Sequence, residues 1–160
     1  MRRQSGVTLV ELLVTLAVIA ILVGVVFPGF RGLMDRNSMT TTANALVMAV
    51  SFARSEALRG AGTVRVRARG TGWEDGWEVV APGGDVVRVF EPIPGALTLT
   101  PPETTPPTVL EFNNQGLLLA GAPQEFTLCL PGDSGVLITV AATGRPSTSG
   151  LDAAACPVGT

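Results

Sequence analysis

The longest apolar stretch of the chain reads VTLVELLVTLAVIAILVGVVF over residues 7–27, directly after the short leader MRRQSG. As an α-helix this stretch would be about 31 Å long, close to the hydrocarbon thickness of a bilayer. A cleaved secretory signal would need a shorter apolar core and a small-residue cleavage site after it. The run ends instead in Phe27-Pro28-Gly29, which lacks that pattern. We therefore expect residues 7–29 to form a membrane-spanning helix.

One charged residue, Glu11, lies near the start of this apolar stretch. A carboxylate near the end of a spanning helix costs about 1–3 kcal/mol unless it is paired or reaches the headgroups. Glu11 therefore either reaches the membrane interface or pairs with a cation. No arginine follows until Arg31, so that cation would lie upstream or on another molecule. Arg2 and Arg3 favour a cytoplasmic N-terminus, but the basic residues just after the run nearly cancel this bias.

The composition of the rest of the chain is that of one soluble domain with a substantial core. The chain has 160 residues, no histidine, 11 basic residues, all of them arginine, and 13 acidic residues. Without histidine, a Ser/His/Asp or Cys/His catalytic site is excluded within this chain. Acidic neighbours such as Glu74 and Asp75 occur by chance in any loop-rich domain. We predict no enzymatic activity, no cofactor and no metal site.

The segment after the apolar stretch has the pattern of an amphipathic helix. Pro28 and Gly29 are expected to interrupt the first helix, and the helical pattern resumes at Phe30. Apolar residues then recur at steps of three and four, and Gly60 and Gly62 are expected to end the helix. We predict an amphipathic helix over residues 30–60 that packs on a sheet. Its apolar stripe is Met39, Ala43, Leu46, Val50, Ala53 and Ala57.

From residue 63 the period of the pattern changes to two, which indicates strands. Short strands with tight turns between them imply antiparallel sheets, so residues 61–160 are predicted to form a β-rich globular domain. Pro101–Pro107 is expected to be an extended loop and Ser147–Thr160 a loose tail. The predicted strands are residues 63–69, 77–80, 86–90, 96–99, 109–112, 125–130 and 136–140.

Cys129 and Cys156 are 27 positions apart, with no CxxC spacing that would suggest zinc or thiol exchange. They form a disulfide if the domain is exported, and otherwise two buried thiols. A bridge would contribute about 3 kcal/mol and pin the tail to the sheet. It would also imply an oxidising compartment, which would place the globular part outside the cytoplasmic membrane.

The N-terminal residues resemble a known processing signal. Residues 6–11, GVTLVE, follow a basic leader and precede about 20 apolar residues, which resembles the class III signal of type IV pilins and type II secretion pseudopilins. The resemblance implies a leader of residues 1–6, a cut by prepilin peptidase between Gly6 and Val7, and N-methylation of Val7. It also implies that Glu11 neutralises the new amine of a neighbouring subunit during assembly. The family usually has phenylalanine or methionine where this chain has Val7.

The C-terminal part resembles the GspH/FimT group of minor pseudopilins. The matching stretches are residues 53–59, 72–73, 76–77, 126–129 and 143–145, followed by the second cysteine. The resemblance implies an α+β, pilin-like fold in which a long N-terminal helix packs on an antiparallel β-sandwich.

The same resemblance implies a function. The first expectation is a minor pseudopilin near the tip of the type II secretion pseudopilus, which supports export of folded proteins across the outer membrane. The alternative is a FimT/FimU-like minor pilin that primes type IV pilus assembly. The implied partners are other pseudopilins or pilins, prepilin peptidase and the inner-membrane assembly platform. The implied location is the bacterial inner membrane, with a single span and a periplasmic C-terminal domain.

DNA contact is a further role of some FimT-type members and is associated with a Gly-Arg-x-Arg stretch. Here Gly144-Arg145-Pro146-Ser147 lacks the second arginine. Arg65, Arg67 and Arg69 alternate along one predicted strand and would project from one face about 7 Å apart, where phosphates could bind. The alternative is a solvated outer face that discourages edge pairing. These four arginines are the candidate DNA or anion contacts.

Overall fold

The computed structural model describes residues 7–102 and 109–156, with side chains given except at 25–31 and 61. The predicted leader and residues 103–107 of the predicted loop therefore lie outside the described residues. The chain divides into two compact units, Met1–Arg36 and Asn37–Thr160. Each unit is described by itself.

Helix α1 spans Leu9–Glu56, 48 residues, and continues through Pro28 and Gly29. The predicted interruption at these two residues is therefore wrong. A proline removes one backbone donor from a helix, but its φ near −65° is itself helical, so a long helix can include it.

In the first unit, the described side chains from Val7 to Gly24 are all exposed. Leu13 and Leu16, for example, are 56% and 55% exposed although they are leucines. Among the residues searched, none of the helices combines the length and the apolar character of a membrane span. The spanning helix expected over residues 7–29 stays a prediction.

In the second unit, the last part of α1 carries the predicted apolar stripe. All six stripe residues, from Met39 to Ala57, are buried. A wider helical turn, η1 (Ala57–Ala61), follows α1, and Gly60 within it has a φ of 89°. This left-handed conformation is accessible to glycine at little cost and ends the helix.

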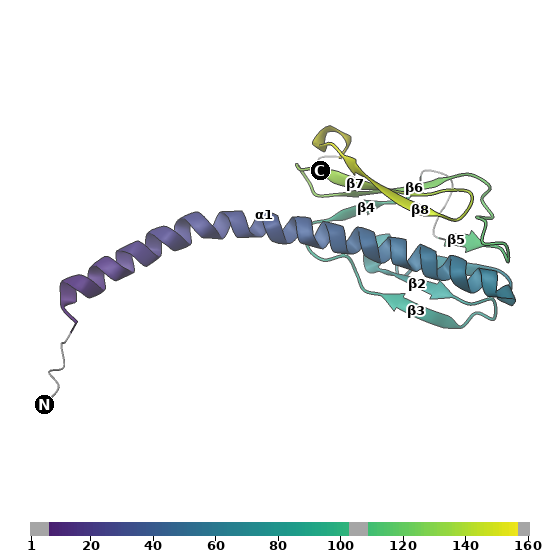
Figure 1. The fold of residues 1–160 in the computed structure, drawn as a ribbon, viewed down its shortest axis with the longest axis horizontal. Coiled ribbons are helices and arrows are strands. Elements are labelled where there is room, and N and C mark those ends of the chain that lie inside the picture. The colour runs from purple at the N-terminus through teal and green to yellow at the C-terminus, as the bar shows by residue number, and fades with distance from the viewer. Residues whose placement is uncertain (1–6, 103–108, 157–160) are drawn as a thin grey trace, which may run out of the picture. The chain divides into compact units, whose positions relative to one another are not determined.

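The second unit also contains two four-stranded antiparallel sheets (Figure 1). The first has the order β3-β2-β1-β5 and the second the order β4-β6-β7-β8. The seven predicted strands are all present within one or two residues. The strands are β1 (Val64–Ala68), β2 (Trp77–Val80), β3 (Val86–Phe90), β4 (Thr98–Thr100), β5 (Val109–Phe112), β6 (Gln124–Cys129), β7 (Gly135–Val140) and β8 (Pro146–Leu151).

Strand β8 corrects the prediction of a loose tail from Ser147. Its residues pair with β7 in continuous antiparallel register from Val140↔Pro146 to Gly135↔Leu151. The segment PSTSGL has no apolar alternation, so its extended form depends on the neighbouring strand. Sequence periodicity could not detect it.

One core cluster joins α1 and both sheets. Leu46 and Val50 of α1 are fully buried, as are Val66 in the first sheet and Phe126 and Ile138 in the second. Apolar side chains from three layers thus leave water together, which is the main stabilising term of such a fold. The predicted α+β class, with a long N-terminal helix packed on antiparallel sheets, is confirmed.

Candidate processing and assembly site

The start of α1 carries the residues predicted to act in processing and assembly. Gly6 lies outside the described residues, and Val7 is the first described residue, 72% exposed. The helix begins at Leu9, immediately after Thr8. Glu11 therefore lies in the first helical turn, close to the predicted cleavage point.

Thr8 fixes this first turn. Its Oγ1 accepts a hydrogen bond from the Glu11 backbone N–H at 3.3 Å, and its carbonyl oxygen accepts one from Leu12 N–H at 3.2 Å. A side-chain oxygen at this position satisfies a backbone donor that has no partner inside the helix. The sequence analysis missed Thr8, although a threonine three residues before a glutamate is the signal of a helix start.

The surroundings of Glu11 are apolar and exposed. Leu9, Val10, Leu12 and Leu13 are each more than half exposed. On the same face of the helix, one turn further along, Val14 is also exposed. A surface that covers Val14 would therefore also cover the Glu11 carboxylate. A cation placed beside Glu11 would then interact with it in a low dielectric, where the attraction is strong.

Of the three arginines predicted to share one face, Arg65 and Arg67 lie on β1, and Arg69 follows its last residue, Ala68. Arg65 and Arg67 are both paired with carboxylates. Arg65 Nε lies 2.7 Å from Glu111 Oε1 on β5. An Arg67 guanidinium nitrogen lies 2.6 Å from Glu78 Oε1 on β2. An anion that binds this face would have to compete with both carboxylates. Phosphate contact at Arg65, Arg67 and Arg69 stays a prediction.

Arg145 belongs to a different part of the unit, the turn between β7 and β8, and it is exposed. This turn is held from α1 by Arg54, whose Nε donates to the carbonyl oxygens of Gly116 and Thr143, both at 3.2 Å. A Cβ on Gly144 would overlap the Gly116 carbonyl oxygen. Arg54 thus ties two turns to the helix, a role that the sequence analysis did not find.

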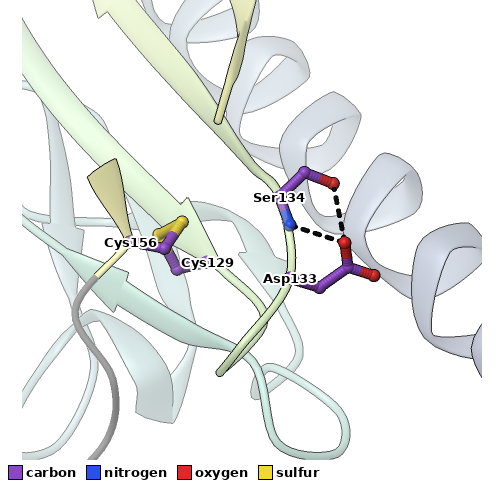
Figure 2. Close-up of a disulfide and its surroundings, with 4 residues drawn as sticks. All are labelled: Cys129, Asp133, Ser134 and Cys156. Carbon is purple, nitrogen blue, oxygen red and sulfur yellow. Dashed lines mark hydrogen bonds between the residues drawn. A yellow bond between two sulfur atoms is a disulfide. The ribbon is translucent and has the colours of Figure 1, made fainter. Parts of the chain in front are cut away.

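The predicted disulfide is present. Figure 2 shows Cys129, the last residue of β6, bonded to Cys156, which follows the short helix η3 (Ala153–Ala155). Gly135 lies opposite Cys129 in the β6–β7 register, and a Cβ there would come within 2.5 Å of Cys156 Sγ. The bridge therefore fits only because this position has no side chain. It fastens the chain after β8 to the second sheet.

Glu74 and Asp75, the acidic neighbours weighed as a catalytic pair, serve the loop structure. Hydrogen bonds from the Thr71 hydroxyl, the Thr71 N–H and the Gly72 N–H to Asp75 Oδ2 lower the pKa of this carboxyl. Glu74 Oε1 accepts a hydrogen bond from the Leu99 N–H at 3.2 Å. Each carboxylate thus holds backbone donors of a turn or strand.

Two protein-family models match the chain. The model described as type II transport protein GspH matches residues 42–144, and the prokaryotic N-terminal methylation motif matches residues 1–27. The first match covers more than half of the chain. The chain belongs to the GspH family. The resemblance to GspH/FimT-type minor pseudopilins is therefore confirmed.

Solved structures with the same fold include the type IV minor pilin FimU of Pseudomonas aeruginosa. One crystal form of FimU matches this GspH-family chain with a TM-score of 0.62 and 23% identity, covering 78% of this chain and 96% of FimU. A second crystal form matches with a TM-score of 0.56 and 20% identity, covering 74% and 96%. A search of curated proteins found no match. At this level of identity, the likeness concerns the fold.

Family membership defines the general character of the protein. GspH-family chains are structural subunits that assemble with other pilin-like subunits. The N-terminal methylation motif implies processing by a peptidase and membrane anchorage as a pilus or pseudopilus subunit. Cleavage after Gly6, methylation of Val7 and the pairing of Glu11 stay predictions for the individual residues.

Proposed function

We propose that this GspH-family chain is a minor pseudopilin near the tip of a type II secretion pseudopilus, where it supports export of folded proteins across the outer membrane. The observation that carries the proposal is the match of residues 42–144 to the type II transport protein model. The role is structural and mechanical, without catalysis or a cofactor.

Assembly depends on the exposed start of α1. Prepilin peptidase cuts after Gly6 and methylates Val7, and the new amine pairs with Glu11 of a neighbouring subunit. Each charge alone is costly in an apolar surrounding, whereas the pair is tolerated because the attraction offsets much of the desolvation. The exposed leucines and valines around Glu11 then pack against the helices of neighbouring subunits, which supply the apolar surrounding.

Before assembly, residues 7–29 anchor the chain in the bacterial inner membrane as a single span. The unit that begins at Asn37 lies in the periplasm, where the inner-membrane assembly platform and other pseudopilins reach it. The disulfide between Cys129 and Cys156 supports this location because such bonds persist in oxidising compartments.

A second candidate function is that of a minor pilin that primes a type IV pilus. Its support is the fold shared with FimU, a type IV minor pilin. DNA contact belongs to this candidate, and its candidate residues are Arg145, Arg65, Arg67 and Arg69. The salt bridges of Arg65 and Arg67 reduce the charge available for it.

A gene deletion in the source bacterium separates the two candidates. Secretion of folded exoproteins should be lost while surface pili remain, and wild-type chain should restore it. Glu11→Ala should fail to restore secretion, whereas the control Glu125→Gln, an exposed acid on β6, should succeed. Loss of pili with intact secretion would support the second candidate. No change in either process would contradict a filament role.

A further inference from the structure

The two sheets have four edge strands, β3 and β5 in the first and β4 and β8 in the second. An edge strand presents a row of backbone N–H and C=O groups with which another strand can pair. Proteins usually protect such edges with short strands, charged side chains or bulges. The four edges of this chain differ in how well they are protected.

Three of the edges carry such protection. β4 has only three residues. The pairing of β3 with β2 shifts register between Val79 and Val80, and Arg88 lies in the middle of β3. β5 has four residues, one of which is the charged Glu111.

Strand β8 has no charged side chain and no bulge, and it is not short. Its first residue, Pro146, lacks a backbone N–H, and proline is a residue that protects edges, but the five residues after it have one each. It pairs with β7 at six consecutive positions without a register shift. No residue from Pro146 to Leu151 is charged, and the small side chains from Ser147 to Gly150 are exposed. Within the described ranges, no strand pairs with its other side. It is thus the longest of the four edges, and from Ser147 to Leu151 it has neither a charged residue nor a bulge.

We propose that the free edge of β8 is a docking site for an extended segment of a partner polypeptide, which adds a fifth strand to the second sheet, antiparallel to β8. Alternating backbone donors and acceptors are the main groups this edge offers, and another extended backbone is their complement. Every pairing in the two sheets is antiparallel, so an antiparallel addition continues the existing geometry. The site goes beyond the proposed function, since it does not depend on which filament the chain joins.

The charges at the ends of β8 define the polarity of the partner strand. The exposed Arg145 precedes the strand and the exposed Asp152 follows it. The first residue of an antiparallel segment would lie opposite Asp152 and its last residue opposite Arg145. A basic first residue and an acidic last residue would therefore form two opposite-charge pairs across the strands.

A second copy of β8 cannot pair its own charged residues with Arg145 and Asp152 in the same way. In a symmetric antiparallel pair, directly opposed residues point to the same face of the sheet. Arg145 and Asp152 are an odd number of positions apart, so they point to opposite faces and cannot meet across such a pair. The partner segment is therefore a different sequence.

A designed octapeptide tests the site on the full-length, isotope-labelled protein in detergent micelles. The probe is the capped peptide Lys-Thr-Val-Thr-Val-Thr-Val-Glu, whose ends match Asp152 and Arg145. We expect saturable changes in the amide chemical shifts of residues 147–152 and none at Thr98–Thr100 on β4. The same peptide with its end charges exchanged should bind about five-fold more weakly, because two exposed pairs become repulsive.

Two controls separate backbone pairing from other binding. N-methylation of one alternate set of peptide amides should abolish the shift changes, and methylation of the other set should leave them, because only one set faces β8. Ser149→Lys should weaken binding at least five-fold, whereas the matched Thr100→Lys on β4 should leave it unchanged. Unchanged tryptophan fluorescence will show that both variants are folded.

Several outcomes would overturn the proposal. These are an absence of shift changes at the solubility limit of the peptide, changes centred on another element, and equal binding of both N-methylated peptides. Amide shift changes in residues 147–152 on concentrating the protein alone would also overturn it, because a second copy would then occupy the edge.

Discussion

The two ends of helix α1 differ in what covers their apolar side chains. From Val7 to Gly24 every described side chain is exposed, although most are leucine, isoleucine, valine or alanine. From Met39 to Glu56 an apolar stripe is buried against two sheets of the same chain. The second unit supplies its own core, whereas the first unit leaves its apolar surface for lipid or other subunits to cover. Substitutions should therefore affect stability in one unit and assembly in the other.

The largest difference is expected between Leu46→Ala and Leu13→Ala. Leu46 is fully buried, so its truncation should lower the free energy of unfolding of the second unit by about 2–5 kcal/mol. Leu13→Ala should leave that free energy within about 0.5 kcal/mol, because the side chain is exposed. Urea unfolding of the full chain in detergent, followed by fluorescence of the buried Trp73 and Trp77, measures both. Equal losses would contradict the comparison.

The disulfide should give the next largest effect. Replacing Cys129 and Cys156 together by serine should lower the free energy of unfolding by about 3 kcal/mol. The bond fastens the chain after β8, so amide hydrogen exchange should rise most in residues 147–151. A uniform rise across both sheets would show that the bond stabilises the unit without a local effect at β8.

Arg54→Met should lower the free energy of unfolding of the second unit by about 1–3 kcal/mol, because the carbonyl groups of Gly116 and Thr143 lose a charged hydrogen-bond donor. The matched control is Arg59→Met. Arg59 is largely exposed and pairs with Glu56 one turn away. Its replacement should therefore change the free energy of unfolding by close to zero. Thermal unfolding measures the shift of Tm that each variant causes. Similar shifts of Tm would show that Arg54 does not tie the turns to the helix.

The smallest effect is a pH dependence at Asp75. Its pKa is lowered in the folded state, chiefly by the Thr71 hydroxyl, so its contribution to stability is present above the unfolded pKa of about 3.9. It is lost as the pH falls through the folded value. Asp75→Asn should therefore be less stable than wild type at pH 6, and the difference should shrink below pH 4. If the stability difference between wild type and Asp75→Asn stayed constant from pH 6 to pH 3, the ionised Asp75 carboxylate would not be its cause.

Sequence patterns predicted the parts of the fold in which buried side chains recur at regular spacing. In the stripe from Met39 to Ala57 they recur every three or four residues, and in the seven predicted strands about every two. Strand β8 was missed because its extended form comes from pairing with β7, which no local pattern records. The role of Arg54 was missed for a similar reason, since its two acceptors lie more than 60 positions away in sequence.

The N-terminal site was predicted from a resemblance and only partly from physical chemistry. Glu11 is predicted because a carboxylate in an apolar run is costly. The role of Thr8 depends instead on its hydrogen bond from the Glu11 N–H, which only the structure shows. The interruption at Pro28 was wrong because a long helix can include one proline.

Mass spectrometry of the mature protein from membranes tests the central claim most directly. The central claim is that the first unit becomes an assembly element through cleavage after Gly6 and a methylated amine on Val7. We predict an N-terminal peptide that begins with N-methylated Val7 and contains Glu11. A mature chain that still begins at Met1 would contradict the account.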